Sequence, residues 1–383
     1  MTLSRRRLLG LGAAAVLTGC GAPSRVAQAP AVTRYEAGLR AAAGRYLTAT
    51  PENPRFPLYP GAVVLAAVGG RVAAHFAVGD AVRYAADKTE LPVAERVAAR
   101  AGTVYDLASL TKTFTAVLAL RLAEQGRLDL DAPAMRYLPS FGAKPGITVR
   151  MLFTHTSGLS KDTPLSGDTP GERLAFILGQ PPVAPPGSGF LYADQNFIAL
   201  GAIVTALRGE RLDTLVRREI AEPLGMADTG YLPPPALLPR VAATEGGIRG
   251  TVHDPSAAAL GGVAGHAGIF ATAADLALFG QALLDGGGPL LKPSTVERMR
   301  TDANARFGPA AAHGLGFDVD QSWYMGRLSG HGAFGHTGFT GTSMVLDPHR
   351  RALLLLTNRV HPDATRGSVN PARKAAANVL ADA

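Results

Sequence analysis

Apolar residues form their clearest pattern near the two ends of the chain. Two apolar runs lie within residues 62–78, on either side of Gly69-Gly70. Residues 342–357 repeat this arrangement around a polar turn at 347–350. Two apolar runs joined by a short turn are typical of a β-hairpin. The sequence therefore predicts one hairpin near each end of the chain.

Three further segments carry the pattern of a helix. Residues 35–47 and 371–383 are helix-like, and Pro371 stands at the start of the second, where proline is favoured. Residues 110–120 are apolar on a helical period, and most of the chain from about 110 to 290 is helix and loop. These patterns predict an α+β fold. An antiparallel sheet built from both chain ends is flanked by helices, with an all-α subdomain inserted.

One serine of the chain has a lysine three residues further on. It is Ser109, followed by Lys112 at the start of the helix predicted over 110–120. Residues at i and i+3 share a helix face, so the hydroxyl and the ammonium can meet. A serine is a poor nucleophile until a neighbour takes its proton, and a desolvated lysine can do so. This spacing indicates an activated serine.

Two further motifs follow in order: Tyr192-Ala193-Asp194 and His336-Thr337-Gly338. Ser-x-x-Lys, then Tyr-x-Asn, then Lys/His-Thr-Gly is the order found in the penicillin-recognising serine hydrolases. The chain resembles their class C β-lactamase branch, which also contains DD-peptidases and esterases. Residues 148–159, 262–270 and 335–342 share the resemblance. It extends from about residue 35 to the C-terminus and implies the β-lactamase/DD-peptidase-like fold, with the active site between the sheet and the helical region.

The resemblance also implies roles for individual residues. Ser109 would be acylated, and Lys112 would accept its proton or act electrostatically. Tyr192 would help to move the proton to the leaving group. Whether the lysine or the tyrosine is the general base stays open. A peptide or ester substrate would then form an acyl-enzyme without any cofactor or metal.

The third motif would line one side of the substrate groove. The strand through His336, Thr337 and Gly338 would edge it, and Gly338 would let the substrate approach closely. The backbone N–H of Phe339, with that of Ser109, would form the oxyanion hole. Backbone donors of this kind contribute roughly 3 to 4 kcal/mol to stabilising the transition state.

Two positions depart from the usual β-lactamase pattern. Asp194 stands where asparagine is most common, and an ionised carboxylate cannot donate a hydrogen bond to a substrate carbonyl. It could instead pair with Lys112 and hold it charged. His336 replaces a lysine, so its charge at neutral pH is marginal. Both changes predict a D-Ala-type peptidase or an esterase. The alternatives are a class C-like β-lactamase and a catalytically idle peptidoglycan-binding lipoprotein.

The N-terminus reads as an export signal. Residues 1–19 begin with a cationic segment that includes Arg5 and Arg6, and an apolar run follows. That run has about eleven residues, too few for the roughly 20 that span a bilayer. It ends in Leu-Thr-Gly-Cys at Cys20, which resembles a lipobox. We expect signal cleavage, lipidation of Cys20, a linker over 20–34 and a hydrolase domain over 35–383. The result is a membrane-anchored lipoprotein of the bacterial cell envelope, exported by the twin-arginine or the Sec route.

Composition adds mainly exclusions. The formal charge is +8, but no basic run with interleaved aromatics is present, so nucleic-acid binding is not expected. The nine histidines show no metal-ligand spacing, and His253, His266 and His331 are expected to be hydrogen-bonded structural or rim groups. The single cysteine excludes an internal disulfide. We expect a monomer that acts on a small-molecule, peptide or ester substrate.

Overall fold

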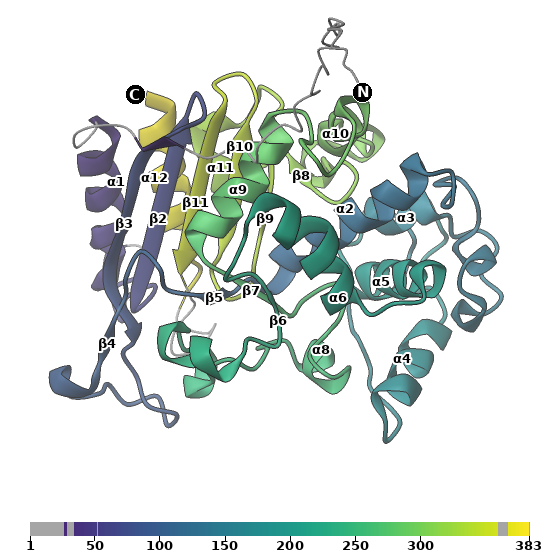
Figure 1. Ribbon diagram of the computed structural model, residues 1–383, viewed down its shortest axis with the longest axis horizontal. Coiled ribbons are helices and arrows are strands. Elements are labelled where there is room, and N and C mark those ends of the chain that lie inside the picture. Colours follow the sequence, from purple (N-terminus) through teal and green to yellow (C-terminus); the bar gives the residue numbers. More distant parts are fainter. Residues whose placement is uncertain (1–26, 29–33, 52, 359–366, 383) are drawn as a thin grey trace, which may run out of the picture.

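A sheet with strands from both chain ends organises the protein (Figure 1). The computed structural model describes residues 27–28, 34–51, 53–358 and 367–382. The sheet has the strand order β1-β3-β2-β11-β10-β9-β8, with β4 beside β3. Its strands are β1 (Ala27–Gln28), β2 (Gly61–Val68), β3 (Arg71–Val82), β4 (Val97–Ala98), β8 (Asp318–Val319), β9 (Phe334–Thr337), β10 (Ser343–Asp347) and β11 (Ala352–Asn358). All pairs are antiparallel except β1 with β3.

Both predicted hairpins are confirmed. Val68 pairs with Arg71 across the Gly69-Gly70 turn, and Asp347 pairs with Ala352 in the second hairpin. The two hairpins join because β2 pairs with β11 along its whole length. The expected sheet from both chain ends is therefore present.

The central strand β2 is buried on both faces. Ala62, Val64 and Ala66 point into one core, whereas Val63 and Leu65 point into the other. Side chains alternate between the faces of a strand, so a continuous apolar run is required where both faces are covered. This alternation explains why residues 62–68 read as an unbroken hydrophobic segment.

Helices cover both faces of the sheet. Helices α1 and α12 pack together on one face, and α9 covers the other (Figure 1). The helices are α1 (Arg34–Gly44), α2 (Thr111–Glu124), α3 (Val149–Phe153), α4 (Pro170–Gly179), α5 (Asp194–Arg208), α6 (Leu212–Val216), α7 (Glu222–Leu224), α8 (Pro255–Ala259), α9 (Ala273–Leu284), α10 (Pro293–Arg300), α11 (Ser322–Met325) and α12 (Asn370–Asp382). The predicted terminal helices are thus confirmed as α1 and α12.

The helical region lies beside the sheet, as expected. Helix α2 packs against α5 and α6, and Phe114 of α2 stacks on Phe279 of α9 with ring centroids 4.4 Å apart. A small sheet, β5 (Tyr105–Asp106), β7 (Ile269–Ala271) and β6 (Gly230–Tyr231), lies at the junction. The same hydrophobic core therefore continues from the main sheet into the helices.

The described structure includes only residues 27–28 and 34 of the expected N-terminal signal and linker. Residues 1–19 and Cys20 lie outside the described residues. Within the segment 20–34, expected as a linker, Ala27–Gln28 instead pairs in parallel with Arg71–Val72. An edge strand presents free N–H and C=O groups, which pair with a neighbouring segment whatever its side chains. In the described part of the chain, no helix is both long enough and apolar enough to cross a bilayer.

Candidate active site

Ser109 lies in a tight turn immediately before α2. Residues 108–110 form one turn of 3₁₀ helix, and Ala108 has a φ of 46°. The Ala108 N–H donates to the Asp106 carboxylate over 2.8 Å, which holds this strained backbone in place. A non-glycine residue with positive φ is strained and persists only where the surrounding structure holds it. Such residues are found most often at functional sites. The turn presents the serine at the positive end of α2.

Lys112 is fully buried and makes two short contacts. Its Nζ donates to the Ser109 Oγ over 2.8 Å and to the Asp194 Oδ1 over 2.7 Å. Burial by itself would lower the pKa of Lys112, but Asp194 and Tyr192 raise it above its usual range. Lys112 therefore remains an ammonium at neutral pH.

Asp194 is the first residue of α5 and pairs with Lys112, one of the two possibilities open from sequence. Burial would raise the pKa of this carboxyl group, but Lys112 and His266 hold it below its usual range. The neighbouring amides do not replace the missing asparagine. Gln195 donates to the Asp162 carbonyl, and Asn196 is fully buried behind the site.

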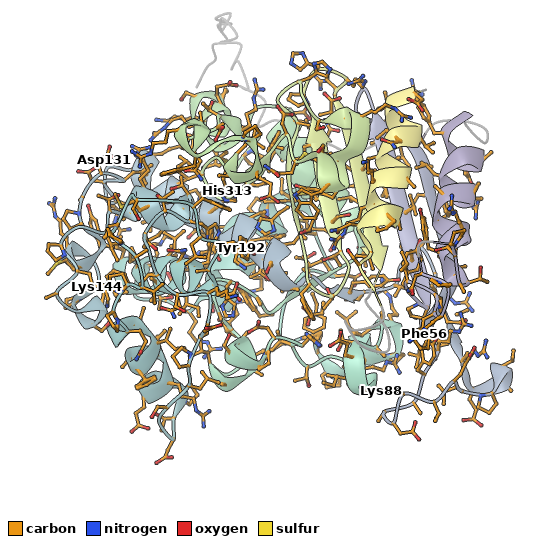
Figure 2. The ribbon with its side chains drawn as sticks, turned by 180° about the vertical axis from the view of Figure 1, so that it is seen from behind. Phe56, Lys88, Asp131, Lys144, Tyr192 and His313 are labelled. Atoms are coloured by element: carbon orange, nitrogen blue, oxygen red, sulfur yellow. The ribbon has the colours of Figure 1, made fainter. Side chains whose placement is uncertain are left out.

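Tyr192 lies two residues before α5, near the middle of the molecule (Figure 2). The residue is 37% exposed, while its hydroxyl interacts with Lys112 and Ser109. The Lys112 Nζ is 5.0 Å from the ring centroid. Desolvation raises the pKa of Tyr192, although the Lys112 ammonium acts in the opposite direction. The structure thus brings Ser109, Lys112 and Tyr192 together.

His336 differs from the expected marginally charged group. It is 2% exposed, and its Nδ1 lies 2.8 Å from the Thr337 carbonyl oxygen. Burial lowers the pKa of His336 to about 4. The ring is therefore neutral at physiological pH, because a buried imidazolium in this position lacks a close carboxylate partner strong enough to offset desolvation.

Gly338 is required by the packing of the protein itself, a constraint that the sequence did not predict. A Cβ at this position would lie 2.2 Å from the Thr342 Oγ1 and 2.4 Å from the Leu107 carbonyl oxygen. The loop after β9 thus packs directly against the turn that carries Ser109. Phe339 follows it, is 55% exposed and stacks on His253.

A cleft of about 920 Å³ joins these residues. It is lined by four aromatic side chains, by four carboxylates, and by three ionisable nitrogen side chains. The aromatic residues are Phe190, Tyr192, Trp323 and Phe339; the carboxylates are Asp194, Glu245, Asp254 and Asp318; the other three are His253, His336 and Arg373. His253 bonds to Glu245 over 2.9 Å, so it is the hydrogen-bonded rim group expected from sequence.

Sequence reasoning missed Asp254 as part of this site. Its Oδ1 lies 2.9 Å from the Nε2 of buried His266, whose backbone carbonyl faces Lys112. Asp194, Asp254 and His266 bring potential metal-ligand atoms within 4.8 Å of one another. The Lys112 ammonium already neutralises Asp194 there. The spacing of these residues along the chain gives no motif, so only the fold reveals the group.

Arg373 on α12 was also missed. Its Nη2 donates to the Gly338 and Thr342 carbonyls over 2.8 and 2.9 Å, and its Nε donates to the Gly341 carbonyl over 3.3 Å. Burial lowers the pKa of Arg373 to about 10, so it stays charged at neutral pH. The guanidinium thus fixes the loop that carries Phe339.

A serine and a buried lysine between an antiparallel sheet and a helical region define a class of acyl-transferring serine hydrolases. Residues 57–378 match the family model described as Beta-lactamase. The chain belongs to the β-lactamase family, and it is a serine hydrolase of that family.

Its relatives include two bacterial proteins provisionally named D-alanyl-D-alanine carboxypeptidase. The protein of Escherichia coli O157:H7 is 32% identical over 82% of this chain and 81% of that protein. The protein of E. coli strain K12 is 32% identical over 72% of this chain and 73% of that protein.

Solved structures share the fold. EstCE1, described as a hydrolase with promiscuous acyltransferase activity, has a TM-score of 0.68 and 23% identity, covering 89% of this chain and 98% of its own. A penicillin-binding protein homologue from Caulobacter crescentus has a TM-score of 0.67 and 22% identity, covering 91% and 99%. At these identities the likeness concerns the fold.

Proposed function

We propose that Ser109 attacks the carbonyl carbon of an ester or peptide and forms an acyl-enzyme. The observation that carries this proposal is the 2.8 Å contact between the Ser109 Oγ and the Lys112 Nζ at the floor of the cleft. The backbone N–H groups of Ser109 and Phe339 would then bind the oxyanion of the tetrahedral intermediate.

Tyr192 is the general base of this proposal. Asp194 keeps Lys112 in its ammonium form, and an ammonium has no lone pair with which to accept the Ser109 proton. The Tyr192 phenolate takes the Ser109 proton as the Oγ–carbon bond forms. It returns that proton to the leaving alkoxide or amine as the bond to the carbonyl carbon breaks. Water then releases the acyl group by the same route.

The charges of the cleft favour substrates without a carboxylate. Four carboxylates line it, whereas His253 is bonded to Glu245 and the described donors of Arg373 engage backbone carbonyls and Asn370. A β-lactam carboxylate would meet no unengaged cation among the described lining residues. We propose short-chain esters as the best substrates, because D-alanyl peptides and β-lactams both carry a carboxylate, and we place the peptides before the β-lactams. The names of the relatives support the peptide substrate.

Two assays test the proposal. A fluorophosphonate probe should label the wild type and fail to label Ser109→Ala, with the thermal melting temperature unchanged. The value of kcat/KM should be higher for p-nitrophenyl butyrate than for nitrocefin. Labelling or ester hydrolysis by Ser109→Ala at the wild-type level would remove the nucleophile from Ser109. A nitrocefin value near the diffusion limit would refute the substrate order.

We also propose that the mature protein is anchored by a lipid at Cys20. The support is the sequence alone: a cationic segment, a short apolar run and Leu-Thr-Gly-Cys. The wild type should sediment with membranes, and mass spectrometry should find an acylated Cys20 at the mature N-terminus. Cys20→Ala should leave the enzyme unprocessed or soluble. An unmodified N-terminus beyond Cys20 in the wild type contradicts the proposal.

A further inference from the structure

We infer that His155 is a positioning residue that fixes the place of Tyr192, an inference that rests on the role proposed for Tyr192. His155 holds the chain on both sides of the tyrosine. The Leu191 N–H donates to the His155 carbonyl oxygen over 2.9 Å, and the Ala193 N–H donates to the His155 Nδ1 over 3.2 Å. One residue therefore binds the main chain immediately before and immediately after Tyr192.

The imidazole also supports the tyrosine ring. The ring centroids of His155 and Tyr192 are 4.5 Å apart, with an angle of 31° between the planes. His155 is fully buried, and Phe197 lies behind it at 5.4 Å. The half-exposed phenol thus has a rigid inner surface on which to rest, although its outer edge faces the open cleft.

The contacts define one protonation state of His155. Its Nδ1 accepts from the Ala193 N–H and also from the Asn196 Nδ2 at 3.0 Å. A nitrogen that accepts hydrogen bonds carries no proton, so the proton is on Nε2. Burial, with His313 and Lys112 nearby, holds the pKa of His155 well below its usual range. The neutral ring can keep both acceptor bonds throughout the physiological pH range.

The backbone of His155 is itself unusual. Its φ is 54°, a left-handed conformation that is uncommon outside glycine, although histidine, like asparagine and aspartate, adopts it more readily than other residues. The conformation aims the carbonyl at Leu191 and the ring at Ala193 together. Proton transfer requires the phenol oxygen within hydrogen-bond reach of Ser109, and a shift of about 1 Å can reduce a rate about 100-fold. The two hydrogen bonds from the Leu191 and Ala193 N–H groups to His155 keep the Tyr192 side chain in this position.

Two substitutions separate the hydrogen bonds from the ring contact. His155→Asn keeps an acceptor at the position of Nδ1 and tolerates the positive φ. His155→Phe keeps a ring but leaves the Ala193 N–H without its acceptor and leaves the Asn196 amide nitrogen only the Ala193 carbonyl. We expect His155→Phe to reduce kcat/KM for ethyl butyrate by about 10- to 100-fold, and His155→Asn to reduce it much less. Equal losses in the two variants overturn the inference.

A comparison of leaving groups separates positioning from general loss of structure. Ethoxide must be protonated as it leaves, whereas p-nitrophenolate leaves without a proton. Tyr192→Phe and His155→Phe should therefore lose more activity on ethyl butyrate than on p-nitrophenyl butyrate, after correction for active sites titrated with fluorophosphonate. Tyr59→Phe, which removes a buried hydrogen bond to the Ala43 carbonyl, is the control and should leave the ratio unchanged.

The outcomes distinguish the inference from the proposed function. If Tyr192→Phe changes the ratio and His155→Phe lowers both activities equally, His155 is only structural and the inference is wrong. If Tyr192→Phe leaves the ratio unchanged, the proposed role of Tyr192 fails and the positioning role fails with it. Loss of fluorophosphonate labelling in Ser109→Ala tests the nucleophile separately in either case.

Discussion

At the scale of single residues, Asp194 decides how charge is balanced beside the nucleophile. Its Oδ1 is 2.7 Å from the Lys112 Nζ, and the two groups form a pair without net charge. An unpaired ammonium would stabilise both a Ser109 alkoxide and a Tyr192 phenolate. Asp194 opposes that effect, and its charge raises the pKa of Tyr192. Asp194 thus keeps Lys112 charged, and the same negative charge reduces the fraction of Tyr192 that is present as the phenolate base.

This balance predicts an alkaline pH profile. Because the pKa of Tyr192 is raised, the phenolate is scarce at neutral pH and increases about tenfold per pH unit below that pKa. The wild-type kcat/KM for p-nitrophenyl butyrate should therefore rise from neutral toward alkaline pH. Asp194→Asn removes the negative charge, lowers the pKa of Tyr192 and should move the rise to lower pH. A profile that is identical in Asp194→Asn would contradict this account.

At the scale of elements, apolar periodicity was sufficient for the hairpins and terminal helices, because their cores impose periods of two and 3.6 residues. The sequence also predicted the candidate catalytic residues Ser109, Lys112 and Tyr192, because each belongs to a short motif of neighbouring residues. Asp254, His266 and Arg373 were not, since they come from loops and from α12 and meet the site only through the fold. Gly338 was predicted from its motif, but its close contact with Leu107 was not, because that contact joins segments far apart in the sequence.

Arg373 of α12 should affect the rate through the loop that carries Phe339. Arg373 donates to the Gly338, Gly341 and Thr342 carbonyls, which lie on either side of Phe339. Arg373→Met should remove three hydrogen bonds from this loop, although the Gly338 and Thr342 carbonyls each keep a backbone N–H donor, and the loss is about 1 to 3 kcal/mol for a buried acceptor left without a partner. We expect a lower melting temperature and a kcat for p-nitrophenyl butyrate reduced about 10-fold or more, as for a displaced oxyanion donor. An unchanged kcat at a temperature where the variant is folded would argue against this role.

At the scale of the whole molecule, one sheet separates two hydrophobic cores. The core beneath α1 and α12 stabilises the sheet, and the other core continues into the helical region. The stacked pair Phe114 and Phe279 connects the nucleophile helix to the helix that covers the sheet. The cleft between the two regions therefore keeps its shape only while both regions are packed together.

Phe279→Ala should reveal this coupling. Removing a fully buried phenylalanine costs about 3 to 5 kcal/mol, so the melting temperature should fall markedly. Because the core is continuous, secondary structure measured by circular dichroism and fluorophosphonate labelling of Ser109 should be lost in one transition. Phe339→Ala, at an exposed position, provides a comparison for stability. Two separate transitions in Phe279→Ala would show that the regions unfold independently.

The pairing of β2 with β11 has a consequence for the time before the chain is complete. Strand β2 ends at residue 68 and β11 begins at residue 352. At a translation rate of roughly 5 to 20 residues per second, β2 waits about 15 to 60 seconds for its second neighbour. During that interval a fully apolar strand has an open edge, which is a template for aggregation. We therefore expect the nascent chain to be prone to aggregation, and a chain that stops before β11 contains Ser109 without the complete sheet beside which the active site forms.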